Sequence, residues 1–185
     1  MIRWLALAGL LLGGAIAATF TGQKLPHLQG DYLTGQKADL PEDLQGNVAL
    51  LVVAFTDGAL ATARKWKSAF DVKTAGQSGV VSLEVFLLNP QNRVARALII
   101  TKLRHAMTRE EERRTIVAFG TEDDWRRRVG YSEENAAYAI LLDPAGTVRG
   151  VYRATGPEER AAQVARAAET ARVLRNPAKK PGHKL

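Results

Sequence analysis

Few residues of this chain are of the types that carry out chemistry. The sequence has no cysteine, which excludes disulfides, thiol catalysis and thiolate metal ligands. Its three histidines, His27, His105 and His183, lie far apart and lack the spacing typical of metal ligands. There is no glycine-rich phosphate loop outside the apolar N-terminus and no nucleophile elbow built on serine. We therefore predict no catalytic residue, no metal site and no cofactor.

The carboxylates also point to structure more than to catalysis. Asp57 follows a continuous apolar run, Val48 to Phe55, at a junction where functional groups often lie. No partner for it is visible in the sequence, so we interpret Asp57 as a helix cap. The adjacent acids from Glu122 to Asp124 stand at a predicted helix start, where negative charge stabilises the helix dipole.

The chain is basic, with a formal net charge of +7, and 46% of its residues are hydrophobic, enough for a packed core. The positive charge favours anionic neighbours such as acidic proteins, lipid headgroups or nucleic acid. Nucleic-acid binding needs basic residues beside exposed stacking aromatics, and only Trp66 and Trp125 have basic neighbours of that kind. Together with the export predicted below, this leads us to expect no nucleic-acid partner.

The N-terminus has the layout of a secretory signal, since Arg3 precedes an apolar run from Trp4 to about Ile16. The run is shorter than the ~20 residues that a membrane-spanning helix needs. We expect an exported protein, periplasmic or held at the inner membrane and facing the periplasm, with an uncut signal anchor as the alternative. The predicted divisions are a signal or anchor over 1–18, an extended lead-in over 19–46, one domain over 47–175 and a basic disordered tail over 176–185. Within the lead-in, turns are predicted at Gly30, Gly35 and Pro41.

Apolar runs of strand length alternate with amphipathic segments of helical spacing. Strands are predicted over 48–55, 80–88 and 115–119, and helices over 59–70, 92–107 and from 121 onward. The stretches AYAILLD and GTVRGVY flank the turn DPAG and predict a hairpin, followed by a helix capped at Thr155. Because such alternation requires crossovers, we expect an α/β fold with a central mixed sheet of about four to five strands flanked by helices.

This order of elements resembles the thioredoxin-like fold. The stretch YAILLDPAGTVRGVYRATGPEE is similar to the end of peroxiredoxin and thiol-reductase domains. In those families the turn after the first buried strand carries the reactive cysteine pair. The resemblance places Ala59 and Thr62, with Asp57 beside them, where that pair belongs. It therefore implies the scaffold of a redox domain without its thiol chemistry.

A second resemblance is to the mitochondrial ATP synthase assembly factor that chaperones the membrane subunit of the proton channel. It rests first on a helix with spaced arginines that ends in a methionine, followed by a strand that ends in Phe-Gly. A helix with acidic residues and an aromatic residue comes next, and then a strand that runs into the motif Leu-x-Asp-x-x-Gly-x-Val-Arg. One difference is that Gly150 stands where the family often has a tryptophan. The matching positions are Arg93, Arg96, Arg104, Met107, Arg113, Ile116, Phe119, Gly120, Asp123, Leu141, Asp143, Gly146, Val148 and Arg149.

The resemblance implies a protein that binds a protein partner, such as an assembly factor or chaperone for a membrane complex like ATP synthase, and that is not an enzyme. A membrane surface is a further partner that the basic helix would suit. The alternative interpretation is that these arginines lie on a helix face that only contacts solvent and binds no partner. Two other functions stay open: an enzyme of peroxiredoxin-like fold with non-thiol chemistry, and a periplasmic module for a small anionic ligand. The expected partner-binding residues are Arg93, Arg96, Arg104, Arg113 and Arg149.

Overall fold

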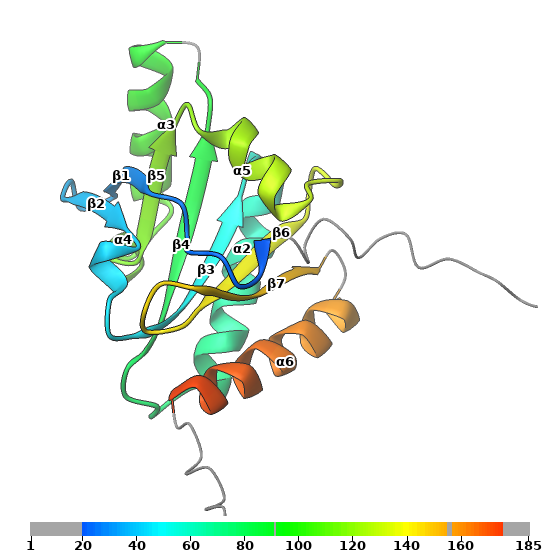
Figure 1. Cartoon of the computed structure of the whole chain (residues 1–185). Helices are drawn as coiled ribbons and strands as arrows, with labels where there is room; N and C mark the ends of the chain where they lie inside the picture. Colours follow the sequence, from blue (N-terminus) through cyan, green and yellow to red (C-terminus); the bar gives the residue numbers. More distant parts are fainter. Residues whose placement is uncertain (1–19, 91, 155–156, 176–185) are drawn as a thin grey trace, which may run out of the picture.

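A seven-stranded mixed sheet forms the centre of the protein in the computed structural model (Figure 1). The structure describes residues 20–90, 92–154 and 157–175. The strands are β1 (Leu28–Tyr32), β2 (Lys37–Leu40), β3 (Val48–Ala54), β4 (Val80–Leu88), β5 (Thr115–Phe119), β6 (Ala137–Leu142) and β7 (Val148–Ala154). Their order across the sheet is β2-β1-β5-β4-β3-β6-β7.

The helices are η1 (Glu42–Leu44), α2 (Asp57–Lys73), α3 (Arg93–His105), α4 (Arg109–Glu112), α5 (Glu122–Val129) and α6 (Pro157–Arg175). α2 and α6 cover one face of the sheet and α5 lies on the other (Figure 1). This arrangement explains why β3 is apolar throughout: every residue of the strand is buried, because alternate side chains enter the cores on opposite faces.

β3 pairs in parallel with β4 and antiparallel with β6, and β4 pairs in parallel with β5. The parallel pairs are joined by α2 and by α3, the crossovers that the alternation of strands and helices predicts. β6 and β7 form the predicted hairpin around the turn DPAG. The expected α/β architecture with a mixed sheet is therefore confirmed.

The sheet is larger than expected because the lead-in contributes two strands. β1 and β2 form a hairpin, and β1 pairs antiparallel with β5 at Asp31↔Val117. We expected a turn at Gly30, but this residue lies inside β1, where a Cβ atom would come within 2.8 Å of the Val117 carbonyl oxygen. The predicted turn at Gly35 is present, with φ at +95°. Both strands are short and carry few apolar residues, so their two-residue periodicity is a weak signal.

The cap of α2 lies one residue earlier than predicted. The cap is Thr56, whose hydroxyl accepts a hydrogen bond from the Ala59 N–H, whereas Asp57 is the first residue of the helix. The interpretation of Asp57 as the cap was therefore wrong. Threonine and aspartate are both favoured N-cap residues, so the sequence alone did not distinguish the two neighbours.

Several predictions concern residues outside the described part of the chain. They are the signal over 1–18, the cap at Thr155 and the tail over 176–185. Among the described helices, none combines the length and the apolar character needed to cross a bilayer.

Candidate partner-binding surface

The turn between β3 and α2 is the position at which the resemblance implied a lost redox site. Its residues have different surroundings: Ala59 is fully buried, Thr62 is half-buried, and the side chain of Asp57 is 72% exposed. The Asp57 carboxylate lies 3.5 Å from the Lys102 ammonium group of α3. An exposed ion pair at this distance contributes little to stability and does not place an acid beside a base.

The loop before β6 packs closely against this turn. The Thr56 hydroxyl donates a hydrogen bond to the Glu134 carbonyl oxygen at 2.7 Å. A Cβ atom at Gly58 would lie 2.1 Å from the side-chain oxygen of Asn135, so a larger residue at this position would displace the Asn135 side chain. The turn is thus held between its own helix and a neighbouring loop.

A cluster of aromatic side chains packs on the core side of the turn between β3 and α2. The ring of Phe55, the residue after β3, packs edge-on against Tyr131 and Tyr138, with centroids 5.4 and 5.9 Å away. The Tyr138 hydroxyl accepts hydrogen bonds from the backbone N–H groups of Ser132 and Glu133. Edge-to-face packing of this kind favours a fixed arrangement. The strand-to-helix junction is therefore a well-packed structural element.

The helix α3 has the opposite character. Asn92 caps it by accepting a hydrogen bond from the Ala95 N–H at 2.9 Å. Leu103 is its one fully buried residue, and Ile99 and Ile100 are half-buried against the core, as their spacing predicted. In Figure 1 the helix stands at one end of the molecule, beside the end of β5.

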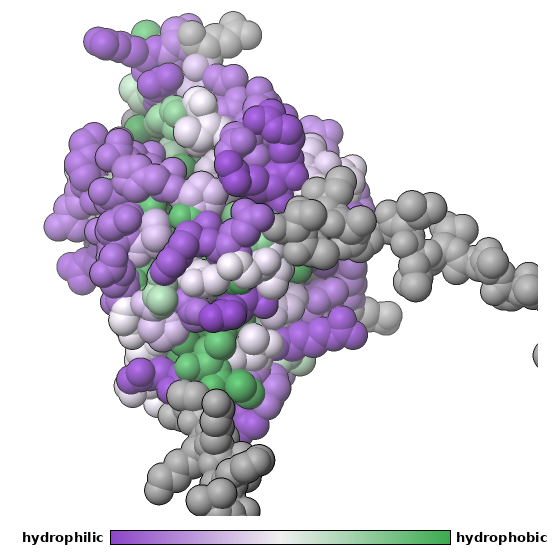
Figure 2. Space-filling view, viewed as in Figure 1, coloured by the Kyte–Doolittle hydropathy of each residue, from purple (hydrophilic) through white to green (hydrophobic). Residues whose placement is uncertain are grey.

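We define the α3 outer face as the exposed residues Arg93, Val94, Leu98, Thr101, Lys102 and His105. The side chains of Val94 and Leu98 are 78% and 69% exposed, among the most exposed large apolar residues described. Every charged residue of α3 is basic. Figure 2 shows apolar side chains at this end of the molecule next to hydrophilic ones. Apolar residues inside a basic surface are typical of a contact surface.

The five predicted arginines do not share one surface. Arg93 and Arg113 are exposed, and the Arg96 guanidinium lies over the Phe119 ring, 4.9 Å from its centroid. The Nε of Arg104 donates a hydrogen bond to the Leu33 carbonyl oxygen at 2.7 Å, which ties α3 to the end of the first hairpin strand. Arg104 therefore has a structural role in addition to its charge.

Arg149 lies on β7, which β4, β3 and β6 separate from β5. Its guanidinium contacts the Asp143 carboxylate at 2.7 Å. Partial burial opposes ionisation of Asp143, but hydrogen bonds from the Thr147 N–H, Arg149 and the Ala145 N–H outweigh it and lower the pKa of the carboxyl. The arginine of the Leu-x-Asp-x-x-Gly-x-Val-Arg motif thus stabilises the β6–β7 turn, far from α3.

Sequence reasoning missed the exposed apolar residues Val94 and Leu98 and the nearby Lys102. Their signal is present, because Val94, Leu98 and Thr101 recur at helical spacing opposite Ile99 and Leu103. The large apolar residues on the core side dominate the pattern, and only the structure shows which of the two stripes is covered.

A second polar feature lies between α2 and β4. A cleft of about 490 Å³ is lined by Arg64, Lys67, Ser68, Asp71, Val72, Ala75, Glu84 and Glu111. Glu84, which interrupts the apolar pattern of its strand, is 4% exposed. Burial raises the pKa of Glu84 to about 7, against the opposing effect of Lys67 and Arg64. One carboxylate oxygen of Glu84 and the Nε of Arg64 have no hydrogen-bond partner among the described residues.

No known family profile matches the chain, and no curated protein matches it. Solved structures do. The chain is 18% identical to a protein described as thiol:disulfide interchange protein DsbE from Chlorobium tepidum, over 82% of this chain and 96% of that one, with a TM-score of 0.55. The exposed lipoprotein thioredoxin Etrx1 from Streptococcus pneumoniae is 10% identical, over 78% of this chain and 98% of that one, with a TM-score of 0.52.

BsSco, a member of the Sco family of cytochrome c oxidase assembly proteins, is 13% identical over 80% of this chain and 94% of that one, with a TM-score of 0.51. At these identities the likeness concerns the fold alone. It confirms the thioredoxin-like fold, and the solved structures include thiol-disulfide oxidoreductases. Since this chain has no cysteine, it lacks the group with which such proteins exchange disulfides. The chain has a thioredoxin-like fold without thiol chemistry.

Proposed function

We propose that this chain is a non-redox thioredoxin-like protein that binds an acidic protein partner through the α3 outer face. The observation that carries the proposal is the exposure of Val94 and Leu98 on a helix whose charged residues are all basic. Apolar contacts would supply binding energy, and the cations at its rim would orient an acidic partner and speed its association.

The chemistry of the turn supports binding over catalysis. Thiol exchange needs a thiolate, and the residues at the corresponding turn are Asp57, Ala59 and Thr62. The packing of that turn against the loop before β6 makes it a support for the fold. A non-thiol enzyme would need a base or acid converging on Asp57, whereas this carboxylate contacts the Lys102 ammonium group near the solvent.

We further propose that the partner belongs to an energy-transducing membrane complex such as ATP synthase, which the protein assists in assembly. Two observations support this choice: the arginine-bearing motifs of the second resemblance, and the existence of an assembly protein, BsSco, among structures of similar fold. The secretory layout of the first residues fits a protein exported to the periplasm or held at the membrane facing it.

The test is co-purification of the full chain from detergent-solubilised membranes of the producing organism. We expect a membrane complex to be recovered with the wild-type protein and lost with the triple variant Arg93→Glu, Thr101→Glu, Lys102→Glu, whose three positions all belong to the α3 outer face. Arg104 is left unchanged because its hydrogen bond to Leu33 supports the fold. The matched control is Lys65→Glu, Lys73→Glu, Arg166→Gln, which changes the net charge equally at other exposed positions.

Recovery of the same complex by wild type and triple variant alike would contradict the proposed surface. The membrane-surface alternative gives a different result: the purified wild type would bind anionic vesicles, the triple variant would not, and no protein would be recovered. That pattern would replace the acidic protein partner with lipid headgroups.

A second candidate is a module for a small anionic ligand, favoured by the cleft beside Glu84. Lys67 is already paired with Asp71 at 2.9 Å, so Arg64, whose Nε has no partner among the described residues, would donate the hydrogen bond to an anion there. This function predicts that a bound ligand raises the melting temperature of the wild type. Arg64→Gln would reduce that rise, whereas the exposed control Lys65→Gln would not.

A further inference from the structure

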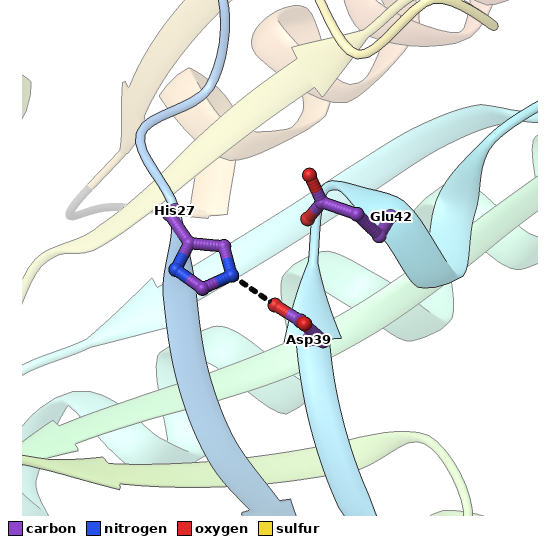
Figure 3. Close-up of side chains that lie close together, drawn as sticks. All are labelled: His27, Asp39 and Glu42. Carbon is purple, nitrogen blue, oxygen red and sulfur yellow. Dashed lines mark ion pairs between the residues drawn. The ribbon is translucent and has the colours of Figure 1, made fainter.

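Three side chains of metal-ligating type meet at the base of the first hairpin (Figure 3). His27 immediately precedes β1, Asp39 lies in β2, and Glu42 is the first residue of η1. Each offers one ligand atom, and these atoms lie within 4.8 Å of one another. The Nε2 atom of His27 contacts Oδ1 of Asp39, and in Figure 3 the Glu42 carboxylate lies beside this pair.

The backbone that carries these residues is fixed by contacts other than their own. The hairpin register pairs Leu28 with Leu40, and both side chains are buried. The Asp39 N–H donates a hydrogen bond to the Asp43 carboxylate at 2.9 Å, which joins β2 to η1. Ligand positions that are set by the fold lower the cost of ordering them when an ion binds.

The charges of the cluster suit a cation. Oδ1 of Asp39 is shielded from solvent and contacts Nε2 of His27. A pair of His27 and Asp39 alone would leave the Glu42 carboxylate unneutralised. With neutral imidazole, the three groups together carry two negative charges, which match a divalent ion.

We propose that His27 Nε2 and the carboxylates of Asp39 and Glu42 form a binding site for a divalent transition-metal ion, with Zn²⁺ as the reference ion. Zinc is bound at about 2.0–2.2 Å by imidazole nitrogen and carboxylate oxygen, so tetrahedral ligand atoms stand about 3.4 Å apart, inside the spread of this cluster. An imidazole ligand favours Zn²⁺ over Mg²⁺ and Ca²⁺, which prefer sites made of oxygen alone. Water would complete the coordination, because His27 and Glu42 are exposed.

The sequence analysis predicted no metal site, and the proposed site departs from that prediction. The three histidines are indeed far apart, but the partners of His27 are carboxylates that come close to it only when β1 and β2 pair. The inference goes beyond the proposed function and does not depend on it, since α3 supplies none of the three ligands.

The test is calorimetric titration of the chelator-treated full chain with Zn²⁺. We expect one Zn²⁺ bound at this site, a loss of at least about tenfold in affinity for His27→Ala and for Asp39→Asn, and unchanged affinity at this site for the double control His105→Ala, His183→Ala. At a Zn²⁺ concentration about a hundred times the dissociation constant, the melting temperature of the wild type should rise by roughly 5–10 °C.

Equal affinities for wild type and His27→Ala would overturn the proposal, as would loss of binding in the control alone. So would binding of Mg²⁺ as tight as that of Zn²⁺.

Discussion

The turn before α2 and the helix α3 are both places where a thioredoxin-like domain could meet other molecules, yet they are built differently. The turn buries Ala59, is braced by Phe55, Tyr131 and Tyr138, and is linked to the loop before β6 through Thr56. The outer face of α3 is exposed, and every charged residue of this helix is basic. Without a thiol the turn serves packing, while exposed apolar residues beside basic ones lie on the neighbouring helix.

The largest expected effect tests this difference with one residue from each region. Phe55→Ala removes a 4%-exposed ring from the cluster beneath the turn and should lower the free energy of unfolding by about 3–5 kcal/mol. Leu98→Ala on the α3 outer face should change it by no more than about 0.5 kcal/mol, because the side chain is 69% exposed. Urea denaturation measures both. A similar loss from the two variants would show that α3 is as tightly packed as the turn.

A slightly smaller effect is expected from Glu84, on the side of the sheet that α2 covers. Its pKa of about 7 lies above its ordinary value of 4.5, so the folded state holds the proton more strongly than the unfolded state does. The resulting cost is absent below pH 4.5, grows as the pH rises toward 7, and is complete above it. Glu84→Gln should therefore stabilise the protein at pH 8 relative to pH 4.5, by up to about 3 kcal/mol.

Urea denaturation of the wild type and of Glu84→Gln at the two pH values measures this change. The exposed control Asp123→Asn should show no comparable gain between pH 4.5 and pH 8. If the stability difference between wild type and Glu84→Gln were the same at both pH values, Glu84 would ionise as a solvated carboxyl does, and the cleft would be open to water.

The smallest effect compares two adjacent residues of the turn. Thr56→Ala removes the cap of α2 and the hydrogen bond to the Glu134 carbonyl, and should cost about 1–2 kcal/mol. Asp57→Ala removes an exposed carboxylate and should change the unfolding free energy by less than about 1 kcal/mol. The measurement is thermal or urea unfolding of the two variants. A larger loss of unfolding free energy for Asp57→Ala than for Thr56→Ala would show that Asp57, and not Thr56, stabilises the turn.

The predictable parts of the fold depend on local and strongly repeated signals. The run from Val48 to Ala54 indicated a strand buried on both faces, and the helical spacing of Ala63, Trp66 and Phe70 indicated the buried side of α2. The hairpin of β1 and β2 gave no comparable signal, because its strands are short and its pairing with β5 joins distant segments. The same holds for the α3 outer face. The sequence indicated the basic character of this helix but did not indicate that Val94 and Leu98 are exposed.

Residue types and their spacing are enough to show that no thiol is available, that strands and helices alternate, and that positive charge is concentrated in segments such as α3. The pairing of the cations follows from folding, because Arg104 and Arg149 meet their partners Leu33 and Asp143 only when distant segments pack together. Folding also withdraws Glu84 from water. The reason is physical: composition and periodicity follow from neighbours along the chain, whereas burial and pairing depend on segments that meet only in the folded state.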